Sequence, residues 1–131
     1  MTWELSQLAD IISAQEGYVV THEADCLLIA NEDGIDAWLA ISGEQILVES
    51  LLFSIDEVKD KAALNEEILR THMLFPLTTI GISSVAGTQY YTAFGSLSSQ
   101  SKKESVLIEI STLFQNVEAF LDAYQDFLKS N

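Results

Sequence analysis

The residues after Gln100 carry the hydrophobic pattern that most restricts the fold. In KKESVLIEISTLFQNVEAFLDAYQDFLK the apolar side chains recur at steps of three and four over about six turns. Ser101 and Glu104 have the spacing of a capping box, which predicts the start of a helix. The chain therefore ends in a long amphipathic helix. Its apolar positions are Val106, Ile110, Leu113, Phe114, Val117, Phe120, Leu121, Tyr124, Phe127 and Leu128.

Between residues 18 and 53 the hydrophobic period changes to two, which indicates antiparallel strands. Four runs of strand-forming residues alternate with turn signals. The runs are YVV, CLLIA, IDAWLAI and QILVESLLF, and the turns are HEAD, NEDG and SGE. Within the third run, alternate side chains from Ile35 to Ile41 share a face that we expect to be core, while Asp36 and Trp38 point the other way.

Two further helices are expected. The first begins at Thr2, a good N-cap, and stops near Gly17. The second opens at the capping box of Ser54 and Glu57 and runs to about Met73, because Pro76 prevents its continuation.

A hairpin follows, formed by TTIGISS and QYYTAFGSLS with VAGT as its turn. We expect Ile80, Ile82, Tyr90, Thr92 and Phe94 on one face. The other face would carry the small residues Gly81, Ser83, Ala93 and Gly95. Glycine in a strand often marks a close approach of another backbone, so these four residues are the predicted partner-binding surface. The alternative is that one of the protein's own helices packs there.

The order of elements predicts one α+β domain over residues 1–131. We expect an antiparallel sheet of about five to six strands with three helices, in the order α-β(3-4)-α-β-β-α. No internal repeat or proline-rich linker divides the chain.

The charge balance excludes two classes of partner. The formal net charge is −14, which would repel nucleic acid and anionic lipid surfaces. Cys26 is the only cysteine, so no intramolecular disulfide can form. The sequence shows neither a basic leader before an apolar run nor an apolar run long enough to span a membrane, so a cytoplasmic location is expected.

No motif predicts a reaction, a cofactor or a metal site. His72 falls in the last turn of the second helix, where an imidazole can interact favourably with the helix end. His22 and Cys26 flank an expected turn that would disperse potential metal ligands. The alternative to a non-catalytic protein is an enzyme or small-ligand domain whose site is assembled from distant residues, His72 with Glu49 or Glu66.

The sequence resembles the YjfI family of uncharacterised bacterial proteins. The resemblance rests on MTWELSQLAD, ISGEQILVESLLF, LNEEILRTHMLFPLT, YYTAFGSLSSQS and TLFQNVEAFL. The element order is similar to the fold of type III secretion chaperones and YbjN-type proteins, which implies a homodimer that binds segments of other proteins. The family supplies no catalytic residues. Its genes often neighbour those of phage-shock-protein A-like membrane-remodelling proteins, which implies a partner of that kind.

Together these observations predict a non-catalytic cytoplasmic protein-binding module. It would act as a chaperone-like adaptor or regulator, linked to a phage-shock-protein A-like envelope-stress system. An obligate subunit with no function of its own is a further alternative.

Overall fold

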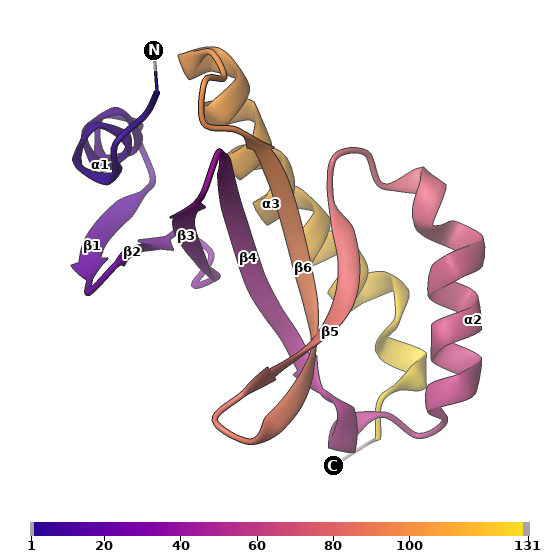
Figure 1. The fold of residues 1–131 in the computed structure, drawn as a ribbon. Coiled ribbons are helices and arrows are strands. Elements are labelled where there is room, and N and C mark those ends of the chain that lie inside the picture. Colours follow the sequence, from indigo (N-terminus) through magenta and orange to yellow (C-terminus); the bar gives the residue numbers. More distant parts are fainter. Residues whose placement is uncertain (1, 130–131) are drawn as a thin grey trace.

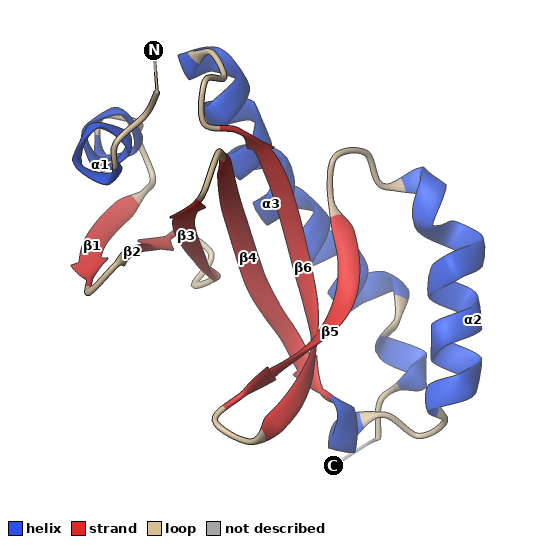
Figure 2. Ribbon diagram, in the orientation of Figure 1, coloured by secondary structure: helices blue, strands red, loops and turns tan. Residues whose placement is uncertain are grey.

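The computed structural model describes residues 2–129, which form three α-helices and six β-strands (Figures 1 and 2). The elements in chain order are α1 (Leu5–Ser13), β1 (Val19–Glu23), β2 (Cys26–Ala30), β3 (Asp36–Ser42), β4 (Gln45–Ser54), α2 (Lys61–Thr71), β5 (Thr79–Val85), β6 (Thr88–Ser98) and α3 (Lys103–Ala123). Short 3-10 turns cover Ile55–Glu57, His72–Leu74 and Gln125–Phe127. The predicted fold class and element order are confirmed.

All six strands form one antiparallel sheet in the order β1-β2-β3-β4-β6-β5. β4 and β6, the two longest strands, pair inside the sheet next to β5, and β1 and β5 are the edges. A bulge between Leu51 and Phe53 shifts the β4–β6 register by one residue. Because side chains alternate along a strand, this extra residue turns Phe53 into the core while Leu51 faces outward.

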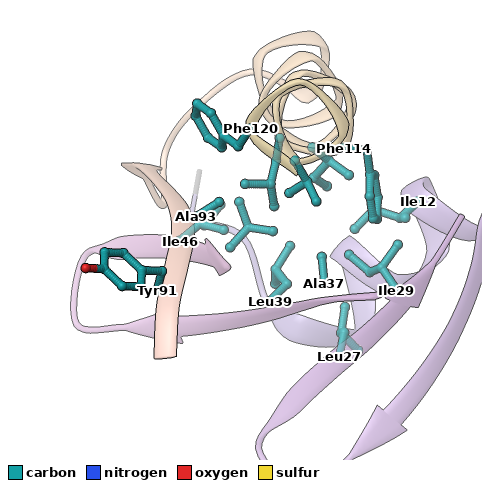
Figure 3. Packing of buried hydrophobic residues seen from close by; sticks show 14 of the residues in the cluster. Ile12, Leu27, Ile29, Ala37, Leu39, Ile46, Tyr91, Ala93, Phe114 and Phe120 are labelled. Atoms are coloured by element: carbon teal, nitrogen blue, oxygen red, sulfur yellow. The ribbon is translucent and has the colours of Figure 1, made fainter. Parts of the chain in front are cut away.

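The hydrophobic core lies between one face of the sheet and the helices α1 and α3 (Figure 3). Phe114 and Phe120 of α3 point toward Leu39 and Ile46 of the sheet, and Ile12 of α1 closes the β1–β2 end. In Figure 1, α3 passes behind β4 and β6, and α2 flanks β5. Within residues 2–129 no helix lies on the opposite face, so one whole side of the sheet is uncovered.

Three predicted helix starts are wrong in position. α1 begins at Leu5, where Glu4 and Gln7 form the capping box, and not at Thr2. The Ser54–Glu57 box exists, but it caps a 3-10 turn. The chain is then extended at Val58, which pairs with Leu128, so α2 starts at Lys61 with Asp60 as its N-cap.

The third helix starts one residue later than its predicted cap. Lys102, and not Ser101, is the N-cap of α3. Ser101 is held in the preceding turn, because its carbonyl accepts the indole N–H of Trp3 at 2.7 Å and its N–H donates to the carbonyl of Ser98. Long-range contacts of this kind leave no local signal in the sequence.

Candidate protein-binding surface

The β5–β6 hairpin does not present the predicted face of small residues. The turn at residues 86–87 pairs Val85 with Thr88, which places Gly81 opposite Thr92 and Ile80 opposite Ala93. Directly opposed residues lie on the same face of a sheet. Gly81 and Ser83 therefore face one side, together with Tyr90, Thr92 and Phe94. Ala93 and Gly95 face the other side, together with Ile80, Ile82 and Tyr91.

The prediction failed because it was one residue out of register. Both turn residues have positive φ, Ala86 at 51° and Gly87 at 83°, which is the geometry of a two-residue hairpin turn. A register error of one residue moves every side chain of a strand to the opposite face. The shared face of Gly81, Ser83, Ala93 and Gly95 is therefore wrong, whichever of them contacts a partner.

Gly95 and Ala93 are buried beneath α3. A Cβ atom added at Gly95 would collide with the carboxylate of Glu109 and lie 3.3 Å from the carbonyl oxygen of Leu77. Glu109 is itself only 6% exposed, and its Oε2 atom has no hydrogen-bond partner in the described residues. Burial raises the pKa of Glu109 above the ordinary carboxyl value. This glycine makes room for one of the protein's own side chains.

Gly81 lies on the uncovered face, under the ring of Phe94. A Cβ atom there would be 3.2 Å from Cε1 of Phe94. The hydroxyl groups of Ser83 and Thr92 are 2.6 Å apart and join β5 to β6 beside it. Gly81 and Ser83 are half-buried, so both remain accessible from this side.

The outer edge of β5 carries free backbone groups. Nε2 of His72 accepts the N–H of Ile80 at 3.1 Å, so this N–H points away from β6. Alternation along the strand directs the backbone groups of Ile82 and Ser84 the same way, and no described strand pairs with them. Residues 71–101 contain no Asp, Glu, Lys or Arg. Edge strands are commonly protected by charged side chains, and this one is not.

An apolar groove of about 370 Å³ lies between α2 and β5. It is lined by Asn65, Ile68, Leu69, Ile80, Gly81, Ile82 and Tyr91. The hydroxyl of Tyr91 donates to Oδ1 of Asn65 at 2.6 Å and fixes α2 against the sheet. Two of its lining side chains, Leu69 and Ile82, are exposed. In the uncharged stretch Met73 is exposed to 94%, and Leu74, Leu77 and Val85 are exposed as well. The absence of charged residues from 71 to 101 was the sequence signal for this surface. The overall composition hides this signal, because the chain as a whole is strongly acidic.

The residues of the alternative enzyme site are not brought together. His72 accepts the N–H of Ile80 and so joins the end of α2 to β5, and no hydrogen bond from His72 to the helix carbonyls is present. Glu66 pairs with Arg70 at 3.5 Å on the exposed side of α2. Glu49 lies on the uncovered face of β4, and β6 separates it from β5.

His22 and Cys26 lie at the two sides of the β1–β2 turn. The thiol of Cys26 donates to the carbonyl of Glu23 at 3.2 Å. Among residues 2–129 no three His, Cys, Asp or Glu side chains cluster in a way that could hold a metal ion. No described helix is long and apolar enough to cross a membrane.

A second hollow, of about 440 Å³, lies between the end of α1, the loop after β2 and α3. Tyr18 and Phe114 form its floor with ring centroids 5.5 Å apart. A hydrogen bond and the charge of Asp33 raise the pKa of Glu118 at its rim. The carboxyl groups of Asp33 and Glu118 are both exposed, so water screens the attraction that they would exert on a cation.

The architecture defines the class of protein. The fold matches the YbjN crystal structure from E. coli with a TM-score of 0.66 and 17% identity, covering 96% of this chain and 93% of that one. It also matches chains of two solved complexes, one of them described as a chaperone–effector complex. The match to the ExsC–ExsE complex has a TM-score of 0.63 and 12% identity, covering 95% of each chain. The match to the HopA1–SchA complex has a TM-score of 0.63 and 15% identity, covering 87% of this chain and 89% of that one. The chain therefore shares its α+β fold with these proteins.

The sequence gives the family. The family described as an uncharacterised protein conserved in bacteria, DUF2170, matches residues 2–128, and the chain belongs to it. The uncharacterised protein YjfI of E. coli strain K12 is 31% identical over 120 residues, covering 88% of this chain and 90% of YjfI. The predicted resemblance is confirmed.

Proposed function

We propose that this chain is a non-catalytic protein-binding module that acts as a chaperone-like adaptor or regulator. The observation that carries the proposal is the open, uncharged edge of β5 beside the apolar α2–β5 groove. A partner segment in extended conformation can pair with the free backbone groups of Ile82 and Ser84 and place apolar side chains in the groove. The fold shared with a chain of the HopA1–SchA chaperone–effector complex and a chain of the ExsC–ExsE complex supports this kind of partner.

Only part of the predicted partner-binding set belongs to this surface. We retain Gly81, which lines the groove, and Ser83, which follows it on β5. We omit Ala93 and Gly95, because α3 covers them.

The finer parts of the proposal concern partner, assembly and place. The first partner to test is the phage-shock-protein A-like protein of the native host, and the setting is the cytoplasmic side of the envelope-stress response. In the absence of a partner, the same edge can pair with its copy in a second molecule, since two β5 strands meet antiparallel about a twofold axis, and partner capture then replaces the homodimer. A homodimer would bury the exposed side chain of Leu69 on α2.

An affinity purification from the native host at endogenous expression tests the partner. The variant Ile82→Lys places a charge on the open edge, and Val19→Lys makes the same change on the exposed edge strand β1. We expect wild type and Val19→Lys to retain the phage-shock-protein A-like protein and Ile82→Lys to lose it. Equal recovery with all three proteins would contradict a role for the β5 edge.

The assembly state has its own measurement. Light scattering coupled to size exclusion should give twice the monomer mass for wild type and for Val19→Lys, and the monomer mass for Ile82→Lys. A monomer mass for wild type at all concentrations would contradict the homodimer. Partner capture would then be tested by the affinity purification alone.

A further inference from the structure

The uncovered face of the sheet carries a row of side chains that the core does not use. Leu28, Trp38, Glu49 and Phe94 are direct cross-strand neighbours on β2, β3, β4 and β6. Directly opposed side chains have Cβ atoms about 5 Å apart. Glu49 is therefore flanked by an indole ring on one side and a phenyl ring on the other, and its carboxylate is exposed.

We propose that this face binds an amphipathic helix of a protein partner, with a Lys or Arg side chain of that helix seated on Glu49 between Trp38 and Phe94. The inference rests on the proposed protein-binding function but uses a surface on the opposite side of the sheet from the α2–β5 groove. The inference specifies a basic side chain on the partner, whereas the α2–β5 groove specifies no charge.

The face is more apolar than a sheet face that only meets water. Antiparallel sheets with one solvated side usually carry polar residues there. Here Ala40 and Leu47 form the next row beside Trp38 and Glu49, and Leu51 flanks Glu49 from the other side along β4. Trp38 and Leu51 are each 38% exposed, and both also border a hollow that Val117 and Leu121 of α3 line. Exposed large apolar side chains beside the half-buried Leu28, Leu47 and Phe94 are typical of an interaction site.

The charge of the face selects a basic partner. Its charged side chains are Glu23, Asp36 and Glu49, while the six strands contain no Lys or Arg. Within the described residues the one ion pair joins Arg70 to Glu66, so no internal cation neutralises Glu49. A guanidinium or ammonium group beside Glu49 would form a charge-assisted hydrogen bond with the carboxylate and cation–π contacts with the adjacent rings.

The backbone of this face favours a helix over a strand. β2, β3, β4 and β6 are interior strands whose backbone groups pair with their neighbours on both sides. A partner can therefore contact only their side chains and cannot extend the sheet here. An amphipathic helix offers an apolar stripe for Leu28, Leu47 and Leu51, as α3 does on the covered face.

Three synthetic helices test the proposal. They are about 20 residues long, share one leucine stripe, and carry Lys, Gln or Glu at one central position of that stripe. Each is titrated into isotope-labelled protein, and the indole N–H of Trp38 and the amides of residues 28, 49 and 94 are followed by NMR. The variant Trp38→Phe assigns the indole signal against that of Trp3.

We expect the lysine peptide to shift these signals and to bind about tenfold more tightly than the glutamate peptide. Glu49→Gln should weaken the binding of the lysine peptide by about tenfold. Glu44→Gln, in the exposed β3–β4 turn, should leave the affinity for this peptide unchanged. Equal binding of the lysine and glutamate peptides, shifts confined to β5, or no shift at Trp38 would each overturn the inference.

The two proposals fail separately. Ile82→Lys leaves the uncovered face intact, so it should bind the lysine peptide as wild type does. Equal recovery of the partner by Ile82→Lys and wild type would contradict the β5 proposal, while Trp38 shifts with the lysine peptide would leave the present inference standing, because the two surfaces share none of the substituted residues.

Discussion

Gly95 and Gly81 lie on the same hairpin and look equivalent in the sequence, yet they serve opposite faces of the sheet. Gly95 makes space for the buried carboxyl group of Glu109 on α3. Gly81 lies under the ring of Phe94 on the uncovered face, beside the α2–β5 groove. A small residue in a strand therefore signals a close approach, but the register decides on which face of the sheet the approaching group lies.

The same contrast holds for the two whole faces. The covered face packs Leu39, Ile46 and Ala93 against α1 and α3 and supplies the core. The uncovered face places Trp38, Glu49 and Phe94 in one row with no helix above them. Stability should therefore depend on the first face, and binding on the second face and on the β5 edge.

The largest expected effect is on the covered face. Leu113→Ala removes a fully buried side chain of α3 and should lower the free energy of unfolding by about 2–5 kcal/mol. Leu51→Ala, on the uncovered face, should cost less than about 1 kcal/mol, because Leu51 is already 38% exposed. Urea unfolding measures both values. Similar losses would contradict the assignment of the core to one face.

A smaller effect is expected at Gly95. The added methyl group of Gly95→Ala would displace Glu109 and press on the carbonyl of Leu77, which should cost about 1–3 kcal/mol. The double variant Gly95→Ala with Glu109→Ala should recover part of this loss, and a double-mutant cycle measures the coupling. Additive effects would show that the two residues do not share the space.

The pH dependence of stability should reveal Glu109. Its folded-state pKa is raised by burial, so the folded protein binds more protons than the unfolded chain. The contribution of Glu109 is present at low pH and is lost as the pH rises from the ordinary carboxyl range through the raised pKa. Glu109→Gln stays neutral and should show less loss over that range.

Urea unfolding of wild type and Glu109→Gln across the acidic range makes the comparison. The difference between the two proteins isolates this residue from the other carboxylates, which titrate in both. A constant difference at every pH would show that the pKa of Glu109 is the same in the folded and unfolded states.

The smallest expected effect is at Gly81. The Cβ atom of Gly81→Ala would meet only the edge of the Phe94 ring, which can move by the few tenths of an ångström required. The free energy of unfolding should change by less than about 1 kcal/mol. Thermal unfolding measures it beside Gly95→Ala. A loss as large as that of Gly95→Ala would remove the contrast between the two faces.

Much of the fold could be predicted because its signals are local. The period-two runs gave the four strands before α2, and the steps of three and four gave α3. The starts of α2 and α3 were predicted wrongly, because contacts between residues far apart in sequence fix them. Val58 pairs with Leu128, and the carbonyl of Ser101 accepts the indole N–H of Trp3. The candidate binding surface was missed in part, because its residues come from α2, β5 and β6.

The sequence by itself determined the class of the fold, the acidic charge, the core pattern and the resemblance to the YjfI family. These properties follow from residue type and spacing along the chain. Only the tertiary structure decided which side of the sheet each hairpin residue faces. It also placed Glu49 between Trp38 and Phe94, and left the β5 edge open beside α2. The physical reason is register: one residue in a turn or a bulge reverses a strand, and only the pairing of strands fixes it.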